Sequence, residues 1–473
     1  MIAAQHKMPL VFGDVKTAFL MGKKQHRPEG ELYADQPPRG IPGLQRGQLL
    51  VLLTPIYGQV DAPLNWFETL ALFLVDVCGM SQSLLDECIF WLFGKDGLLG
   101  VVAVIVDDLI MAGSELFENT VYPKLRERFV FGKWQRYSAI YAGKRIEQNK
   151  ETLEVELEQH EEIMGNMAMV HLPRDVRLRG VDALVPPEIR DVARSQSGSL
   201  AWYARETRPD CSGDASMIQS MFPDITVQGV ISLNKAIKKM TGTKVVLKFV
   251  AVDAVRFLLS TDAGWANALN EEGEQVKSQC GWLLGVTDQK VEDGNAQRFS
   301  LLSWRSHRAD RVCNSTLMAE SVSLGEGLAA LRYYQVMWGE ITEGRSLREL
   351  LTAQLPATIC IDCKSAYDTL SSYATNKNKR CHLELVMTKQ ELRKNQHSLR
   401  WVATQFMLSD SLTKLHHGGD YLREVIRDST YQVQVEESQL EAKKRARMHK
   451  KLAKQMDGEV LYLAWLVHRR RKG

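Results

Sequence analysis

An apolar run over residues 98–105 is followed at once by Val106-Asp107-Asp108. Of all the features of the sequence, this pattern restricts the possible folds most. A run of this length and composition predicts a buried β-strand. Two like charges beside an apolar core repel each other and resist desolvation, so a strand does not normally end in this way. A divalent cation removes the conflict, and oxygen ligands suit Mg²⁺. Taken alone, two Asp residues in a hairpin turn are more often solvated turn formers.

Further motifs precede this carboxylate pair. Asp14 opens the segment Asp-Val-Lys-Thr-Ala-Phe-Leu, in an apolar context that places Phe19 five residues after the acid. Gln36-Pro37-Pro38 comes next, and the pattern Tyr-Gly…Ala-Pro…Trp-Phe then spans residues 57–67. In their joint order with Val-Asp-Asp, these motifs resemble the reverse transcriptase of copia-type LTR retrotransposons.

The resemblance implies a palm-type polymerase domain in which Asp14, Asp107 and Asp108 hold two Mg²⁺ (or Mn²⁺) ions. One ion would activate the primer 3′-hydroxyl, and the other would neutralise the triphosphate and the leaving pyrophosphate. The Val15 carbonyl would add a metal ligand. Phe19 falls where such enzymes carry the aromatic residue that excludes a 2′-hydroxyl. Without its flanking motif, Phe19 would be better explained as a core aromatic.

Two departures from the family pattern bear on polymerase activity. Asp61 stands where the family usually has Gln in the Tyr-Gly-x-x-Gln-Ala-Pro element. A carboxylate near the incoming triphosphate is unfavourable unless it is protonated or bound to metal. The chain also begins only 13 residues before Asp14, whereas the family has an upstream fingers region that supplies basic contacts to the nucleotide. We therefore expect the polymerase half to bind a primer–template and to extend it poorly.

The second half of the chain carries an independent pattern of predicted elements. They are strands over 255–262, 279–286 and 299–304, a helix from about 315 to 338, a strand over 357–362, a helix near 381–394, a strand over 399–403 and a short helix over 408–414. This is the element order of the ribonuclease H fold, which has a mixed five-stranded sheet with helices.

Four acids occupy particular places in this order: Asp262 and Asp362 end strands, Glu320 lies in the long helix, and Asp410 lies in the final helix. Their surroundings also resemble the copia-type ribonuclease H, as in Asp-x-x-Ser-Ala and Ser-Asp-Ser-Leu-Thr-Lys. The resemblance implies that the four acids chelate two Mg²⁺ about 4 Å apart and activate a water against the RNA phosphodiester. Any one of them alone is more often a solvated carboxylate.

The motifs suggest four regions. We expect a reverse transcriptase palm over 1–148, a thumb or connection over 149–250, a ribonuclease H-like domain over 251–428 and a basic tail over 429–473. The middle region contains Ser197–Asp210, which resembles the copia-type Thr-Arg-Pro-Asp element before the ribonuclease H domain. The predicted fold class is therefore an α+β palm, a connecting α/β region and an α/β ribonuclease H-like domain.

Composition supports this division without identifying a function. The 473 residues, 45% of them apolar, suffice for two or three cored domains, and the net charge of +3 does not mark a nucleic-acid-binding protein. Basic runs over 443–454 and 468–472 fit phosphate binding, a nuclear signal or equally a solvated tail helix. The eight cysteines form no disulfide pattern, and no signal peptide or membrane-length apolar run is present. We expect an intracellular, cytoplasmic protein, with nuclear entry through the tail left open.

The sequence therefore predicts an enzyme, an RNA-directed DNA polymerase with ribonuclease H activity, as a piece of a copia-type Pol polyprotein. Its expected partners are an RNA template, a DNA primer, the RNA–DNA hybrid and deoxynucleoside triphosphates, without a membrane and with no predicted oligomeric state. The alternative is a decayed retrotransposon remnant that only binds nucleic acid. The seven acids favour the enzyme, whereas Asp61 and the missing fingers favour the remnant.

Overall fold

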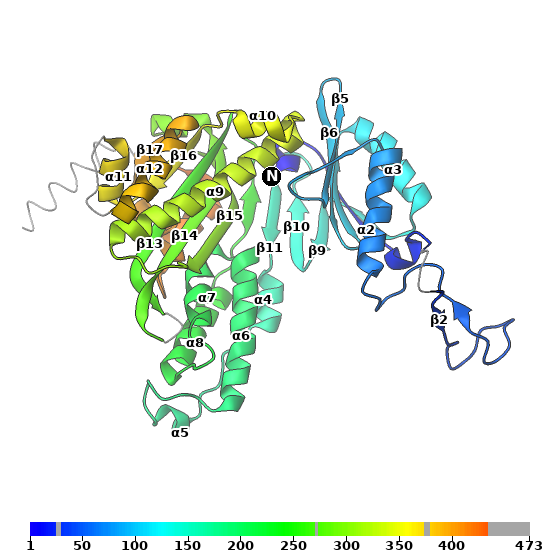
Figure 1. Cartoon of the computed structure of the whole chain (residues 1–473), viewed down its shortest axis with the longest axis horizontal. Coiled ribbons are helices and arrows are strands. Elements are labelled where there is room, and N and C mark those ends of the chain that lie inside the picture. The colour runs from blue at the N-terminus through cyan, green and yellow to red at the C-terminus, as the bar shows by residue number, and fades with distance from the viewer. Residues whose placement is uncertain (25–29, 270–272, 373–378, 434–473) are drawn as a thin grey trace, which may run out of the picture. The chain divides into compact units, whose positions relative to one another are not determined.

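The computed structural model describes residues 1–24, 30–269, 273–372 and 379–433 (Figure 1). The chain forms two units that each combine distant segments. Unit 1 contains Met1–Ala168, Ile237–Val252 and Ala329–Leu355, and unit 2 contains Met169–Ala236, Asp253–Leu328 and Pro356–Gly473. The predicted connection over 149–250 therefore contributes to both units. The basic runs over 443–454 and 468–472 lie outside the described residues.

Unit 1 is organised around a six-stranded antiparallel sheet in the order β4-β5-β6-β7-β1-β8 (Figure 1). A four-stranded sheet has the order β12-β11-β10-β9, and β2 pairs with β3. The strands are β1 (Leu10–Val15), β2 (Tyr33–Ala34), β3 (Leu50–Val51), β4 (Ser81–Gln82), β5 (Ile89–Gly94), β6 (Gly97–Ile105), β7 (Asp108–Gly113), β8 (Phe131–Arg136), β9 (Ser138–Tyr141), β10 (Lys144–Gln148), β11 (Val155–Glu158) and β12 (Leu247–Phe249).

The helices of unit 1 include two that it shares with unit 2. They are α1 (Ile2–Gln5), the 3₁₀ turn η1 (Ala18–Met21), α2 (Ala62–Leu72) with its π-helical extension η2 (Phe73–Val77), α3 (Glu115–Arg128), α4 (His160–Asn166), α10 (Leu347–Thr352), and the C-terminal parts of α8 (Val227–Gly242) and α9 (Thr316–Glu343). Within the described part of the chain, none of the helices combines the length and the apolar character that crossing a membrane requires.

The main sheet of unit 1 buries both of its faces because side chains alternate along each strand. Val11 faces the cluster that includes Trp66 of α2. Leu10 and Phe12 face the opposite way and pack with residues of the four-stranded sheet. Asp14 continues the alternation of Leu10 and Phe12, so its carboxylate lies on the face away from α2.

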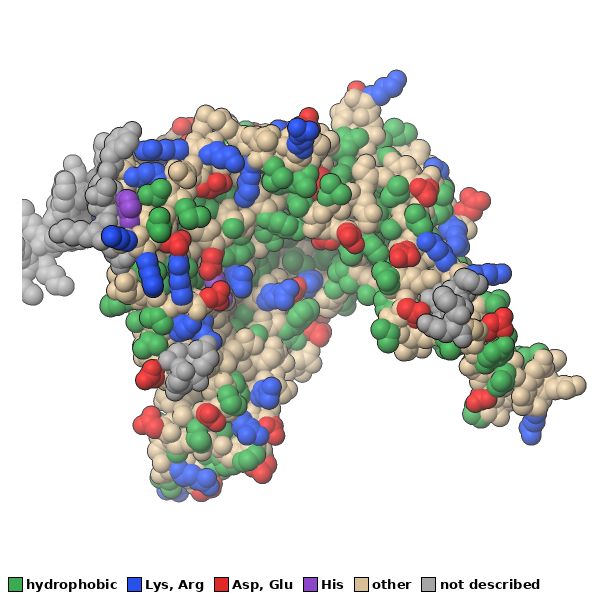
Figure 2. All heavy atoms as spheres, viewed as in Figure 1, with side chains coloured by type: hydrophobic (Ala, Val, Ile, Leu, Met, Phe, Trp, Pro, Cys, Tyr) green, Lys and Arg blue, Asp and Glu red, His purple; other side chains and the backbone are tan. Residues whose placement is uncertain are grey.

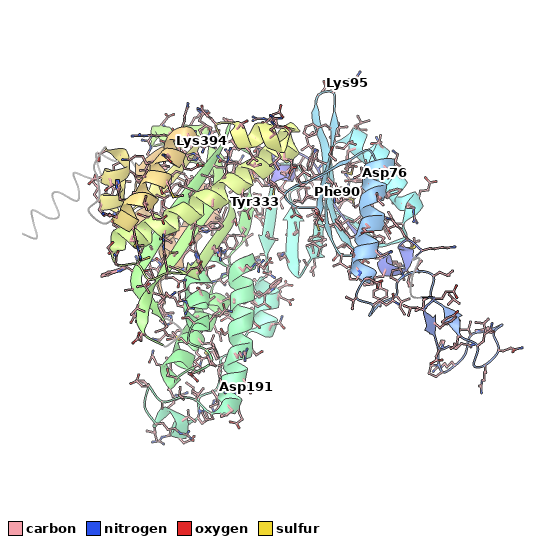
Figure 3. All side chains as sticks on the ribbon, viewed as in Figure 1. Asp76, Phe90, Lys95, Asp191, Tyr333 and Lys394 are labelled. Carbon is pink, nitrogen blue, oxygen red and sulfur yellow. The ribbon has the colours of Figure 1, made fainter. Side chains whose placement is uncertain are left out.

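The C-terminal part of α9 is held to the β4–β5 region of unit 1 by buried hydrogen bonds. Glu340 accepts bonds from the Ser83 hydroxyl at 2.7 Å and from the Leu84 backbone N–H at 3.0 Å. The Tyr333 hydroxyl, labelled with Phe90 in Figure 3, donates to the Leu85 carbonyl at 3.1 Å. The bonds from Ser83 and Leu84 satisfy the Glu340 carboxylate, which is only 4% exposed.

Unit 2 is organised around a six-stranded mixed sheet in the order β17-β16-β13-β14-β15-β18. Its strands are β13 (Val255–Leu269), β14 (Gln275–Asp288), β15 (Gln297–Arg308), β16 (Ala357–Ile361), β17 (Ser398–Trp401) and β18 (Thr430–Tyr431). β16 pairs in parallel with both β13 and β17. The predicted mixed five-stranded sheet is confirmed, and the two-residue strand β18 extends it.

The helical elements of unit 2 surround this sheet, together with the N-terminal parts of α8 and α9. They are α5 (Arg174–Arg177), α6 (Pro187–Glu206), η3 (Pro209–Cys211), α7 (Ser212–Gln219), η4 (Gln289–Asp293), α11 (Lys364–Ser371), α12 (Lys379–Lys394), η5 (Thr404–Phe406), η6 (Asp410–Leu412) and α13 (Asp420–Asp428). The predicted helix over 408–414 is a single 3₁₀ turn, η6.

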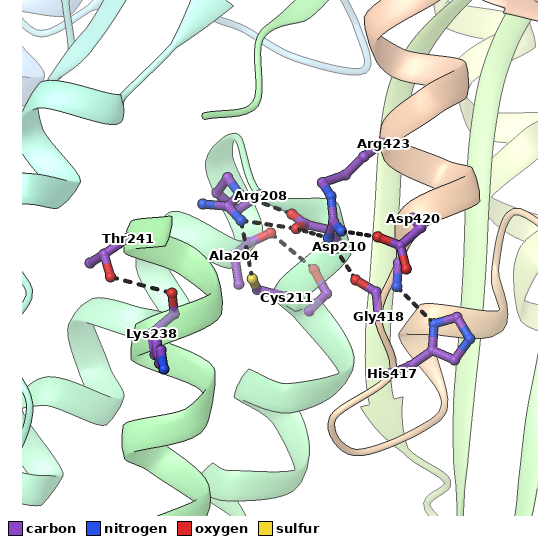
Figure 4. A network of polar contacts seen from close by, with 12 residues as sticks. Ala204, Arg208, Asp210, Cys211, Lys238, Thr241, His417, Gly418, Asp420 and Arg423 are labelled. Carbon is purple, nitrogen blue, oxygen red and sulfur yellow. Dashed lines mark hydrogen bonds and ion pairs between the residues drawn. The ribbon is translucent and has the colours of Figure 1, made fainter. Parts of the chain in front are cut away.

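The Thr-Arg-Pro-Asp element forms a buried ion-pair cluster between α6 and α13 (Figure 4). Arg208 donates two hydrogen bonds to Asp210, both at 2.9 Å, and the two side chains are 1% and 0% exposed. Arg423 of α13 donates a third bond to Asp210 at 3.1 Å and another to the Gly418 carbonyl at 2.6 Å. The cluster thereby ties the segment that follows α6 to α13.

Replacing Arg208 should destabilise unit 2 because a buried carboxylate would lose its bidentate partner. We expect Arg208→Met to lower the free energy of unfolding by about 3 kcal/mol, measured by urea denaturation. Arg190→Met on the preceding helix, α6, is the matched control, because Arg190 is 42% exposed and its ion pair is with the neighbouring Asp191. Equal stability of the two variants would contradict a stabilising role for the cluster.

Candidate active sites

Three of the predicted ribonuclease H acids meet beside the end of strand β16 in the unit 2 sheet. Asp262 lies in the middle of β13, which continues to Leu269, so the prediction that this acid ends its strand was wrong. Asp362 follows the last residue of β16, as predicted. Because β13 and β16 are parallel neighbours with Thr261 opposite Ile361, the two acids lie side by side where β16 ends. Asp410 opens η6, and ligand oxygens of the three carboxylates all lie within 4.8 Å of one another. Sequence reasoning predicted all three.

Hydrogen bonds from neighbouring residues orient the carboxylates on the two strands. Asp362 accepts from the Thr404 hydroxyl at 2.7 Å, and its backbone carbonyl accepts from the Trp401 indole at 2.8 Å. Asp262 accepts from the Thr413 hydroxyl. The Ser323 hydroxyl, from α9, donates to the Asp262 carbonyl at 2.8 Å. The site is therefore fixed from four elements rather than by the strands alone.

Two basic side chains that sequence reasoning did not assign contact Asp410. Lys414 donates a hydrogen bond to one carboxylate oxygen, and His417 Nε2 lies 2.8 Å from the other. Burial opposes ionisation of Asp410, but the bonds from His417 and Lys414 outweigh it and lower its pKa. The i,i+4 spacing of Lys414 from Asp410 was a signal that could have revealed the first contact. No spacing rule pointed to His417.

Burial and repulsion from neighbouring carboxylates raise the pKa of Asp262 and of Glu320. The pKa of Asp262 rises to about 7, chiefly through burial, then through the charge of Asp362, with the Thr413 hydrogen bond opposing. Glu320 of α9 is 6% exposed, and its pKa is raised well above the usual value by burial and then by Asp262. Glu320 is thus electrostatically coupled to the site, although it is outside the set of three acids within 4.8 Å.

Glycines allow the segment that carries Asp410 to approach its neighbours closely. A Cβ at Gly213 of α7 would lie 2.4 Å from the Ser411 carbonyl oxygen. A Cβ at Gly281 of β14 would lie 2.6 Å from the Leu412 side chain. Because real Cβ atoms do not make such contacts, η6 can sit here only against glycine.

In unit 1, the strand pairing brings two of the predicted polymerase acids together. Asp14 of β1 lies opposite Asp108 of β7 in the antiparallel register. Ile105 also pairs with Asp108, so Val106 and Asp107 form a two-residue turn between β6 and β7. The Val15 backbone N–H donates to the Asp107 carbonyl at 2.9 Å, which fixes this turn against the end of β1.

Trp66 of the Trp-Phe motif forms a hydrogen bond with the turn that carries the carboxylate pair. Val106 has a φ of 55°, a left-handed conformation that is strained for a β-branched residue. The Trp66 indole, 1% exposed, donates to the Val106 carbonyl at 2.6 Å. This bond holds the strained turn that presents Asp107 and Asp108.

The carboxylate of Asp14 rests over Gly132 of β8. A Cβ at Gly132 would lie 2.6 Å from Asp14 Oδ2. Lys133, the residue opposite Asp14 in the β1–β8 pairing, was not assigned by sequence reasoning. The pKa of Asp108 is raised by burial and then by the charges of Asp107 and Asp14, while Lys133 opposes the rise.

The remaining predicted residues of unit 1 are less tightly gathered. Among the described residues, Asp14, Asp107 and Asp108 do not form a set with ligand atoms all within 4.8 Å. Phe19 is half-buried, and its ring centroid lies 4.7 Å from that of Tyr57. Asp61 is exposed at the N-terminus of α2. The roles predicted for the Val15 carbonyl, Phe19 and Asp61 stay predictions.

Comparison with known proteins supplies the family context. Residues 1–171 match the family described as reverse transcriptase (RNA-dependent DNA polymerase). Over 431 residues the chain is 21% identical to the retrovirus-related Pol polyprotein from transposon RE1 of Arabidopsis thaliana. It is 22% identical over 428 residues to that from transposon RE2 of the same plant. The chain is similar to the reverse transcriptase–ribonuclease H region of copia-type Pol polyproteins.

Each of these alignments covers 87% of this chain and 27% of the relative, so the chain spans about a quarter of the length of these polyproteins. Solved structures of ribonucleases H also match. The N-terminal RNase H domain of a Mycobacterium tuberculosis protein is 16% identical, with a TM-score of 0.23, over 37% of this chain and 99% of that one. LC11-RNase H1 in complex with RNA/DNA hybrid is 13% identical, with a TM-score of 0.24, and the match covers 33% of this chain and 94% of that one.

The contact between Gly132 and Asp14 gives a test of the reverse transcriptase site. Gly132→Ala should displace the Asp14 carboxylate and reduce primer extension by at least about tenfold, a barrier increase of about 1.4 kcal/mol. Gly165→Ala is the matched control, because a Cβ there meets nothing within 4 Å. Full extension by a folded Gly132→Ala variant would remove Asp14 from the reacting centre.

Proposed function

We propose that this chain is an RNA-directed DNA polymerase with ribonuclease H activity that uses two divalent metal ions at each site. The main support for this proposal is the set of three acids in unit 2 whose ligand atoms lie within 4.8 Å of one another. Its substrates would be an RNA template, a DNA primer, deoxynucleoside triphosphates and the RNA–DNA hybrid. The regions 1–148, 149–250 and 251–428 would serve as palm, connection and ribonuclease H-like domain.

The acids of unit 2 suit a divalent metal. Three carboxylates in a buried site repel each other, as the raised pKa of Asp262 indicates, and a cation offsets that repulsion. Asp262, Asp362 and Asp410 would hold Mg²⁺ or Mn²⁺, with Glu320 as the fourth acid. When bound, the metal would supply an activated water and stabilise the charge that develops on the phosphodiester.

The surrounding residues would set the protonation and orientation of these ligands. Lys414 and His417 keep Asp410 ionised, since their hydrogen bonds lower its pKa. Thr404 fixes one oxygen of Asp362, so the other oxygen remains to bind. Thr413 fixes one oxygen of Asp262 in the same way.

A basic helix next to the sheet of unit 2 would bind the nucleic-acid backbone. In α12, the exposed side chains include four cations: Lys379, Arg380, Arg393 and Lys394. Lys and Arg side chains gather on this part of the surface in Figure 2, and Figure 3 labels Lys394. Such side chains contribute affinity for phosphates without reading the sequence.

In unit 1, Asp14, Asp107 and Asp108 would hold the polymerase metals, with the Val15 carbonyl as a further ligand. Lys133 faces these acids and would offset charge on the triphosphate, while Phe19, against Tyr57, would contact the sugar. Asp61 would disfavour the nucleotide. The alternative, a remnant that binds nucleic acid without turnover, is favoured by Asp61 and by the wider spacing of the three acids in unit 1.

The first test is Mg²⁺-dependent cleavage of a labelled RNA–DNA hybrid. Wild-type protein should cleave the hybrid, and Asp362→Asn should reduce the rate at least about a thousandfold, equivalent to about 4 kcal/mol. Calorimetric titration should show weaker Mg²⁺ binding by the same variant. Asp368→Asn on α11 is the matched control, because its carboxylate is 60% exposed and pairs with Lys364. Hybrid binding by wild-type protein without any cleavage would support the remnant instead.

A second test concerns sugar selection. Phe19→Ala should allow ribonucleotides to be incorporated during primer extension, because the ring that would block the 2′-hydroxyl is gone. Discrimination is measured as the ratio of kcat/KM values for a deoxynucleotide and its ribonucleotide. Tyr57→Ala is the control, because it removes the ring contact with Phe19 but leaves the Phe19 ring that would block the 2′-hydroxyl. An unchanged ratio in Phe19→Ala would return Phe19 to a packing role.

A further inference from the structure

Unit 2 contains a groove that neither proposed active site uses. It has a volume of about 790 Å³ and is lined by α6, α7, β14 and β15. Its lining includes three tryptophans, three arginines and a histidine, and it includes no Asp or Glu. A groove that combines aromatic and cationic side chains without acids is chemically suited to a polyanion with stacking groups.

Two tryptophans give the groove a stacking surface. Trp202 of α6 is 48% exposed, although burial of an indole is favourable. Trp304 of β15 donates its indole N–H to the Ala204 carbonyl at 2.8 Å, so its ring is held in place. An exposed indole beside a fixed one is a platform on which an unpaired base can stack.

Arginines at the groove carry charge that the protein itself neutralises little. The Arg205 side chain is 82% exposed, and it forms an ion pair with the neighbouring Glu206 at 3.8 Å. Arg305 of β15 is exposed and has no ion pair or hydrogen bond with the described residues. Glu326 lies 2.5 Å from His307, but it does not line the groove. The groove thus has charge to offer to phosphates.

The groove is joined to the segment that carries a proposed metal ligand. The Ser306 hydroxyl, which lines the groove, donates to the Leu412 carbonyl at 2.5 Å. Leu412 lies two residues after Asp410 on η6. A strand held in the groove would therefore run beside the segment that positions Asp410.

We propose that this groove binds a single-stranded segment of nucleic acid, with a base on Trp202 and phosphates on Arg205 and Arg305. A duplex keeps the faces of its bases stacked inside, so only an unpaired base can use the exposed indole. The inference rests on the proposed function, since it assigns the groove to a strand that extends beyond the hybrid at the ribonuclease H site.

Fluorescence anisotropy with a labelled single-stranded DNA 12-mer and the full chain tests this directly. Trp202→Ala should weaken binding roughly 5- to 100-fold and leave the salt dependence unchanged, because a stacking contact carries no charge. Trp202→Phe should restore most of the affinity. Arg305→Gln should reduce the slope of log K against log salt by about 0.7, the value for one phosphate contact on a single strand. Arg179 is an exposed arginine that does not line the groove, so Arg179→Gln should change neither the affinity for the 12-mer nor the slope of log K against log salt.

Each outcome decides a separate point. Unchanged single-strand affinity in both Trp202→Ala and Arg305→Gln would overturn the proposal. Equal weakening for a blunt RNA–DNA hybrid in Trp202→Ala would also overturn it, because the groove would then take a duplex. If wild-type protein cleaves no hybrid but Trp202→Ala still weakens single-strand binding selectively, the proposed function fails and the groove assignment stands.

Discussion

Repulsion among buried carboxylates is the constraint on which the arrangement of unit 2 depends. Asp262, Asp362 and Asp410 have ligand atoms within 4.8 Å of one another, and burial of Asp262 and Asp410 removes water that would otherwise screen their charges. The parallel pairing of β13 with β16 fixes two of these acids side by side. The third requires other restraints, because a single 3₁₀ turn such as η6 has little stability of its own.

Those restraints come from elements far away in the sequence. The backbone of η6 packs against Gly213 and the Leu412 side chain packs against Gly281, where any larger residue would collide. The buried pair of Arg208 and Asp210, extended by Arg423, ties the segment after α6 to α13. The Thr-Arg-Pro-Asp element therefore acts structurally, by fixing the surroundings of Asp410, and none of its residues belongs to the acid cluster.

In unit 1, neighbouring carboxylates are positioned by the turn between β6 and β7. Asp107 and Asp108 are presented by a two-residue turn in which Val106 is strained, and the Trp66 hydrogen bond to Val106 holds that conformation. Two motifs that are 40 residues apart in the sequence are thus parts of one local structure. Their joint occurrence has a physical cause, because the turn depends on the indole donor.

By itself the sequence determined the elements and most of the acids. The apolar run before Val106 gave β6, the strand order gave the mixed sheet of unit 2, and motifs marked Asp262, Asp362 and Asp410, because these signals depend on local periodicity and residue type. Only the tertiary structure decided which groups lie on those acids. Lys414 and His417 on Asp410, Gly132 beneath Asp14, and the groove at Trp202 arise from chain segments whose approach no local pattern encodes.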